Sequence, residues 1–220
     1  MNKFLIILSI VATSLLLQVN IYGNNQAKEL YFSIDLKKNV GSTTWIYIQK
    51  GFEEARNANA NIIIIEMNTY GGEVGYADSI RTKILNSDIP VIVFIDNNAA
   101  SAGALISIAC DKIYMSQAAT IGAASVVDQT GQKLPDKYQS YMRATMRATA
   151  EAHGKDTVVT GNDTVVKWKR DPLIAEAMVD ERTVVPNVAD SGKILTLTTQ
   201  EALKYGYCDG TAENIREIIK

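Results

Sequence analysis

The feature that most constrains the fold is a regular alternation of short apolar runs with amphipathic segments of helical spacing. The second and third runs are apolar almost throughout, which is typical of strands buried on both faces. An alternation of this kind predicts right-handed crossovers and an α/β fold built on a mostly parallel sheet. The expected strands are Glu29–Asp35, Asn61–Asn68, Pro90–Asp96 and Lys112–Ser116, and the expected helices between them are Thr43–Ala58 and Gly75–Ser87.

The second half of the chain carries clear helix boundaries. A long helix is expected over Asp136–His153, and Gly154 follows it where a left-handed residue ends a helix. Farther on, Thr198 and Glu201 have the spacing of a capping box, with Gly206 as a stop. We expect one domain with no linker.

The segment DTVVTGNDTVV interrupts this pattern, because the tetrapeptide DTVV occurs twice, at Asp156 and at Asp163. Two β-branched runs around Gly161 and Asn162 predict a small hairpin inserted between two helices. We interpret this hairpin as a surface decoration.

The N-terminus differs from the rest of the chain. A positive start is followed by the apolar run FLIILSIVATSLLL and then by polar residues from Asn24. The apolar run is shorter than the ~20 residues of a spanning helix, so residues 1–23 are expected to be a secretory signal and residues 24–220 the mature, extracytoplasmic domain. An uncleaved membrane anchor is the alternative. Cys110 and Cys208 are left unassigned between a disulfide and two free thiols.

Charge and composition exclude several functions. The net charge is -2 over 220 residues, so the chain has no basic excess and nucleic acid is not an expected partner. There is no cluster of metal ligands and no phosphate-binding loop in the sequence, so we expect neither a metal site nor a cofactor.

Chemistry-bearing residues follow the two most apolar strands. Gly71 and Gly72 come directly after the second strand, and Ser101 follows the third at the start of an expected helix. Open α/β folds place their sites at the carboxyl ends of strands. Free backbone N–H groups at the glycine turn and at Ala102, beside the Ser101 hydroxyl, would suit acyl transfer. Taken singly, the glycines are better explained by a tight turn and Ser101 by a helix N-cap, and it is their combination at the ends of buried strands that favours a site.

Four segments together resemble one known family. They are IIIIEMNTYGGEVGYADSIRTKI, PVIVFIDNNAASAGALISIACDKIYMS, TIGAAS and MRATAEAHGKD followed by DPLIAEAMVD. They are similar to the nodulation-efficiency protein D (NfeD) family of membrane-linked serine peptidases, in the Clp and signal-peptide-peptidase-A class. The resemblance covers nearly all of Glu29–Lys220.

The resemblance implies a Clp/crotonase-like spiral of ββα units. It also implies a serine nucleophile at Ser101 and an oxyanion hole formed by the N–H groups of Gly72 and Ala102. Family members commonly cleave apolar segments of stomatin-like membrane proteins and usually assemble as homo-oligomers. Many continue beyond the matching C-terminal segment into membrane spans.

Two positions depart from the family pattern. Tyr70 stands where the glycine pair is usually preceded by proline. The lysine that serves as general base in active relatives corresponds to Arg147, and a guanidinium stays protonated in any protein site. Lys137 is the one lysine in this expected helix, and His153, the single histidine, is expected to cap the end of the same helix rather than to act in catalysis.

We therefore expect an exported serine endopeptidase of Ser-Lys dyad type that cleaves apolar peptide segments through an acyl-enzyme on Ser101. Lys137 is the candidate base. The alternative is a catalytically inactive binding protein for a membrane partner, because Arg147 occupies the base position. A crotonase-type acyl-thioester enzyme is a third class, but coenzyme A is cytosolic and the chain is expected to be exported.

Overall fold

The computed structural model describes residues 29–160 and 163–219 of the chain. The expected signal segment 1–23 lies outside the described residues. Within them, no helix has both the length and the apolar character needed to cross a membrane.

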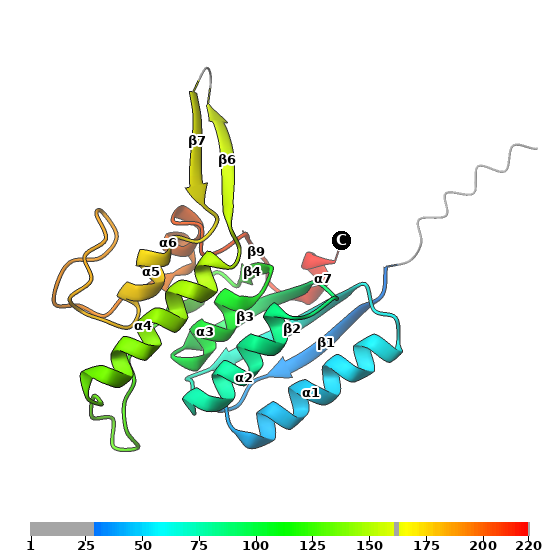
Figure 1. Cartoon of the computed structure of the whole chain (residues 1–220). Helices are drawn as coiled ribbons and strands as arrows, with labels where there is room; N and C mark the ends of the chain where they lie inside the picture. The colour runs from blue at the N-terminus through cyan, green and yellow to red at the C-terminus, as the bar shows by residue number, and fades with distance from the viewer. Residues whose placement is uncertain (1–28, 161–162, 220) are drawn as a thin grey trace, which may run out of the picture.

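The described residues form a central sheet and a separate two-stranded ribbon (Figure 1). The strands are β1 (Tyr31–Leu36), β2 (Ile62–Thr69), β3 (Val91–Ala100), β4 (Lys112–Met115), β5 (Thr120–Gly122), β6 (Lys155–Thr160), β7 (Asp163–Trp168), β8 (Thr196–Thr198) and β9 (Gly210–Thr211). The helices are α1 (Ser42–Asn57), α2 (Val74–Leu85), α3 (Ala102–Ala109), α4 (Asp136–Glu151), α5 (Pro172–Ala177), α6 (Thr199–Lys204) and α7 (Ile215–Ile218).

The main sheet has the order β1-β2-β3-β4-β9, and all four of these pairings are parallel. β5 adds to the end of β3 in parallel, and β8 pairs with β5 antiparallel. The mostly parallel α/β fold predicted from the sequence is therefore confirmed. The short strands β5, β8 and β9 were not predicted, because runs of two or three residues carry no usable periodicity.

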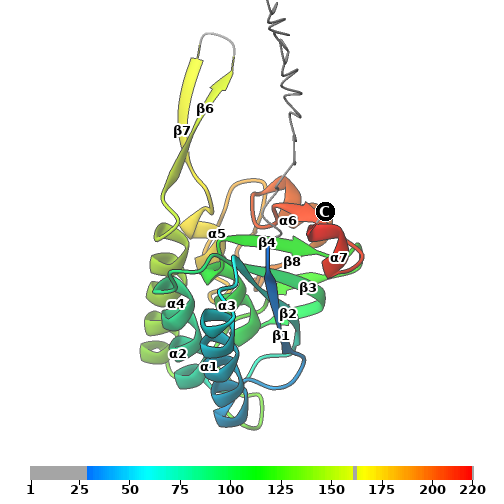
Figure 2. The same ribbon diagram turned by 90° about the vertical axis from the view of Figure 1, so that its right-hand side faces the viewer.

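Helices α1 to α4 pack on one face of the sheet (Figure 2). The burial of β2 and β3 explains their sequences, since Ile63, Ile65 and Met67 face the helices whereas Ile64 and Phe94 join a smaller cluster on the opposite face with α7. Strands buried on both sides cannot alternate polar with apolar residues.

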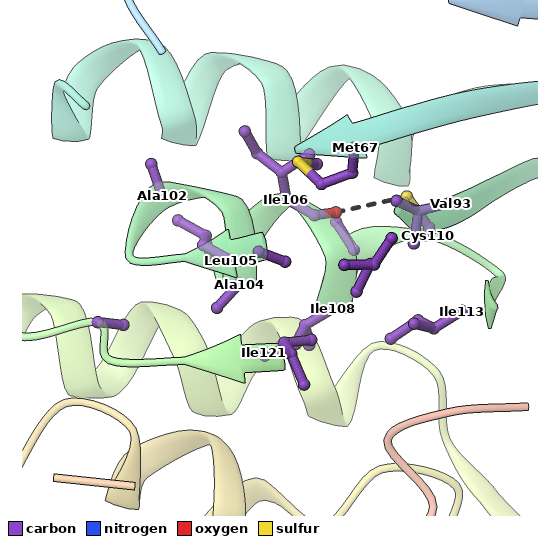
Figure 3. Packing of buried hydrophobic residues seen from close by; sticks show 14 of the residues in the cluster. Met67, Val93, Ala102, Ala104, Leu105, Ile106, Ile108, Cys110, Ile113 and Ile121 are labelled. Carbon is purple, nitrogen blue, oxygen red and sulfur yellow. Dashed lines mark hydrogen bonds between the residues drawn. The ribbon is translucent and has the colours of Figure 1, made fainter. Parts of the chain in front are cut away.

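Helix α3 lies at the centre of this layer, and every residue of it is buried. Its side chains pack against Met67, Val93, Ile113 and Ile121 from four strands (Figure 3). The Cys110 thiol donates to the Ile106 carbonyl at 3.4 Å. Such a helix has no solvent-exposed face, so its N-terminus is held rigidly against the sheet.

Several predicted boundaries are confirmed. Gly154 and Gly206 adopt positive φ values of 70° and 76° after α4 and α6. Thr198 and Glu201 form a complete capping box. The hairpin between α4 and α5 is also present as β6 and β7. Cys110 and Cys208 are both buried free thiols.

Candidate active site

Ser101 lies at a sharp turn between β3 and α3. Its backbone has φ 55° and ψ -116°, a conformation that costs a non-glycine residue free energy and that is concentrated at functional sites. The Ser101 N–H donates to the Gly122 carbonyl at 2.8 Å, so β5 holds the turn. Although Ser101 occupies the N-cap position of α3, its side chain makes no capping hydrogen bond. The helix-cap interpretation therefore does not explain the serine.

The glycine turn after β2 lies directly against Ser101. A Cβ atom added to Gly71 would lie 2.6 Å from the Ser101 Cβ and 3.0 Å from its Oγ, so only glycine fits. A Cβ on Gly72 would lie 2.0 Å from the carbonyl oxygen of Val40. Both glycines also have positive φ values, 114° and 153°. The structure thus brings together the two loops that the sequence placed separately.

Neighbouring hydrogen bonds hold this turn, and none of them uses the Gly72 N–H as its donor. The Val40 N–H donates to the Gly71 carbonyl at 2.8 Å, and the Glu73 N–H donates to the Val40 carbonyl at 2.9 Å. The Gly71 N–H donates to the Thr69 hydroxyl at 3.2 Å. Within the described residues, the Gly72 N–H has no acceptor.

Ala102 supplies a second unpaired backbone donor. It is the first residue of α3, and the described residues offer its N–H no acceptor, as expected for the first turn of a helix. Ala102 is 5% exposed, so this donor lies in a largely water-excluded position. The site therefore combines a hydroxyl held on a strained backbone with a free N–H on the next residue and another in the adjacent glycine turn.

Three contributors to this site were missed in the sequence. Gly103 allows α3 to approach β2, because a Cβ there would lie 2.7 Å from the Thr69 methyl group. Thr69 also donates to the Lys38 carbonyl at 2.8 Å, which ties the glycine turn to the segment after β1. Gly122 anchors Ser101. The segment TIGAAS contains Gly122, but nothing local to it indicates a hydrogen bond to a distant serine.

Lys137 and Arg147 both lie on α4 but in different surroundings. Lys137 is exposed in the first turn, with its Nζ 4.8 Å from the centre of the Tyr138 ring. Arg147 donates to the Glu176 carboxylate on α5 at 2.6 Å. Lys137 as the base remains a prediction, and no contact between it and Ser101 occurs among the described residues.

Helix geometry sets the level of each side chain relative to Ser101. α3 and α4 start at the same end of the molecule and lie side by side (Figure 1), and a 2.7 Å hydrogen bond joins His153 Nε2 to the Ile108 carbonyl near their C-terminal ends. At 1.5 Å per residue, Ser101 lies about 10 Å before that bond, Arg147 about 9 Å before it and Lys137 about 24 Å before it. By this estimate Arg147 is nearer than Lys137 to the level of Ser101, since Lys137 is about 14 Å beyond it.

His153 caps a helix, but α3 rather than its own. Desolvation by burial, helped by the neighbouring Arg170 and Lys169 charges, lowers the pKa of His153 from 6.5 to about 4, whereas the hydrogen bond to Ile108 opposes this shift. The expectation that His153 caps the end of its own helix is therefore wrong, because its ring binds the Ile108 carbonyl of α3. The lowered pKa leaves this ring neutral at pH 7. Buried Arg170 also donates to the Ile108 carbonyl, at 3.4 Å.

In the part of the chain that the structure describes, no group of three or more His, Cys, Asp or Glu residues could hold a metal ion. A cavity of about 370 Å³ lies between β1 and α1. It is lined by Asp35, Leu36, Lys37, Lys38, Thr43, Thr44 and Tyr47. The Lys38 carbonyl connects this cavity to Thr69 and so to the glycine turn.

A mostly parallel sheet with a sharply turned serine at the end of its third strand defines a protein of the Clp-like α/β class. ClpP1 from Listeria monocytogenes, at 20% identity, shares this fold with a TM-score of 0.59 over 86% of the chain and 94% of ClpP1. A family model described as NfeD1b, N-terminal domain, matches residues 30–162 and 160–220. The chain belongs to this family, which confirms the resemblance and the Clp-like fold expected from the sequence.

Two curated relatives are similar over 88% of the chain. Membrane protein NfeD1b of Bacillus subtilis is 34% identical over 194 residues, and membrane-bound protease PH1510 of Pyrococcus horikoshii is 29% identical over 202 residues. The chain spans 41% and 40% of their lengths.

Solved structures of the 1510-N membrane-bound stomatin-specific protease are also similar. A serine-to-alanine mutant has a TM-score of 0.71 and 28% identity, covering 87% of this chain and 84% of its own. A lysine-to-alanine mutant in complex with a substrate peptide has the same TM-score and identity, covering 87% and 79%.

Proposed function

We propose that the chain is a serine endopeptidase in which the Ser101 hydroxyl attacks a peptide carbonyl to form an acyl-enzyme. The N–H groups of Gly72 and Ala102 would bind the oxyanion. The observation that carries this proposal is the contact of Gly71 with Ser101, which places a strained, non-capping serine against a turn with a free backbone donor. The similarity to a named protease supports it.

The proposed substrate is an apolar segment of a stomatin-like membrane protein. A 1510-N structure contains a substrate peptide, and that protease is described as stomatin-specific. In this chain, the cavity between β1 and α1 offers Leu36 and Tyr47 as apolar lining close to the glycine turn. Tyr70, 77% exposed, adds an aromatic ring next to the same turn. Export, membrane association and assembly as a homo-oligomer belong to the same proposal.

The general base decides between this function and its alternative. Lys137 is the lysine that the sequence offers for a Ser-Lys dyad, but position 147 is the nearer of the two to the level of Ser101. A guanidinium stays protonated in protein sites, so Arg147 cannot accept the serine proton, and it forms an ion pair with Glu176. This ion pair favours the second candidate function, a catalytically inactive protein that binds the tail of a membrane partner.

Covalent labelling separates the two functions. A fluorophosphonate forms a stable bond with an activated serine, so the peptidase proposal expects stoichiometric labelling of the full chain and none of Ser101→Ala. Cleavage of peptides from a stomatin-like protein should be lost in the same variant. Peptide binding by the wild type without labelling or cleavage would contradict the peptidase proposal and support the binding function.

A further inference from the structure

The ribbon formed by β6 and β7 projects away from the body of the protein (Figures 1 and 2). Its strands pair only with each other, in an antiparallel register that sets Thr157 opposite Val166. Its valines are exposed to solvent, with values of 68% for Val159, 54% for Val165 and 60% for Val166. A lone two-stranded ribbon is marginally stable in water, and its free edges are templates for another strand.

The backbone hydrogen bonds show which groups of β7 face outward. The Lys169 N–H donates to the Gly154 carbonyl at 3.1 Å, so these opposed residues form a hydrogen-bonded pair. Such pairs alternate along an antiparallel ladder. Odd-numbered residues of β7 therefore direct their backbone groups toward β6, and Thr164, Val166 and Trp168 direct theirs toward the open edge.

The sequence of β7, DTVVKW, is complementary to itself when reversed. Asp163 and Lys167 stand two residues to either side of Val165. Within the described residues, neither charge takes part in an ion pair. An antiparallel copy centred on Val165 would therefore place each Asp163 opposite a Lys167.

We propose that this edge is a self-association surface, in which β7 pairs antiparallel with β7 of a second copy of the chain. Thr164 of one copy lies opposite Val166 of the other and exchanges backbone hydrogen bonds with it. Val165 meets Val165 of the second copy on the two-fold axis, and Asp163 lies opposite Lys167 of the second copy. These last pairs are of the non-hydrogen-bonded kind, whose side chains approach more closely.

Backbone and charge select the same register independently. Outward groups occur on even residues only, so the register can shift only in steps that keep even residues opposite each other. If the register moves one step toward the tip of the ribbon, Asp163 of one copy lies opposite Val165 of the other. If it moves one step toward the base, Val165 of one copy lies opposite Lys167 of the other. Only the central register joins both Asp–Lys pairs with a Val–Val pair.

The open edge of β6 has no such complementarity. Its outward residues are Lys155, Thr157 and Val159, and an antiparallel copy centred on Thr157 places Lys155 opposite Val159. The Lys155 ammonium already lies over the Trp168 ring, 4.3 Å from its centre. Pairing through β7 alone closes a two-fold dimer with a four-stranded ribbon, whereas pairing through both edges would form an open chain of molecules.

Two proline variants test the surface with a matched control. Val166→Pro removes an outward N–H of β7 and no hydrogen bond to β6, and Val159→Pro does the same on the β6 edge. In sedimentation equilibrium of the full chain, Val166→Pro should weaken dimerisation at least about tenfold, because two symmetric hydrogen bonds are lost. Val159→Pro should dimerise like the wild type. A monomeric wild type, or equal association of both variants, overturns the proposal.

Charge reversal and cross-linking test the register. Asp163→Lys should weaken the dimer by opposing two like charges, and Asp163→Lys combined with Lys167→Asp should restore it in part. Val165→Cys should form an intermolecular disulfide on mild oxidation, whereas Val159→Cys should not. Cys110 and Cys208 are 0% and 6% exposed and do not compete. Cross-linking of both cysteine variants to the same extent, or no rescue by the double charge exchange, also contradicts the proposed pairing.

Discussion

Gly71 and Ser101 are in direct contact: a Cβ on the glycine would lie 2.6 Å from the Cβ of the serine, closer than real Cβ contacts allow. The two residues come from the ends of neighbouring strands, β2 and β3. The space between Gly71 and Ser101 holds the hydrogen atom of a glycine but has no room for a side chain. The arrangement therefore depends on glycine for space as well as for backbone conformation.

Gly71→Ala should displace Ser101 from the turn. We expect fluorophosphonate labelling to slow about 100-fold or more, since a shift of about 1 Å is enough to disrupt attack geometry. The control is Gly75→Ala in α2, where an added Cβ meets nothing within 4 Å and where labelling should not change. Unchanged labelling of a folded Gly71→Ala variant would show that Ser101 does not need this contact.

Arg147→Lys should create or raise peptidase activity, because lysine at the level of Ser101 can lose its proton. The rate should climb with pH between about 6 and 10, and adding Glu176→Gln should move the rise to lower pH, since the carboxylate stabilises the protonated lysine. Peptide cleavage across this range provides the measurement.

The Lys137→Ala variant tests whether Lys137, the other candidate, is the general base. Lys137 is exposed in the first turn of α4, so we expect that it does not act as the base and that the variant cleaves peptides at the wild-type rate. A loss on the order of 10²–10⁴-fold in a folded Lys137→Ala variant would instead make Lys137 the base. If neither the wild type nor Arg147→Lys cleaves peptides, the peptidase proposal is contradicted and the binding function is supported.

His153 should make stability depend on pH in acid. Its folded pKa of about 4 is below the ordinary 6.5, so the unfolded chain binds more protons between these values and the free energy of unfolding decreases as pH falls through this window. The free energy of unfolding can be measured with urea at about pH 7.5 and about pH 4.5. We expect its decrease between these two pH values to be about 1–2 kcal/mol smaller in His153→Gln than in the wild type. Equal decreases would contradict this account.

Asp180 is a buried carboxylate that joins α4 to the chain after α5. It accepts hydrogen bonds from Arg182 and Arg143, both at 2.6 Å, and the bonds from Arg182 are the main reason that its pKa is lowered. Asp180→Asn should decrease the free energy of unfolding by about 2–3 kcal/mol, because Arg143 loses its buried partner. Asp190→Asn, at a side chain 88% exposed, is the control and should change it little.

The main strands and helices could be predicted because each depends on periodicity within about ten residues. β2 and α4 were expected to within a few residues of their observed bounds. β3 was not, since it runs on through polar residues to Ala100, and this extension brings Ser101 to the turn. The extension pairs with β5, a strand too short to recognise locally.

The sequence by itself determined the parallel α/β layering, the positions of the glycine turn and of Ser101, and the absence of a lysine at position 147. Apolar periodicity and residue type suffice for these, because both are local properties of the chain. Only the tertiary structure decided that Gly71 touches Ser101, that Arg147 is nearer than Lys137 to its level, and that His153 caps α3 as a neutral ring. These features depend on side-by-side packing of elements far apart in sequence, where the distance between two residues is set by the register of whole helices and strands.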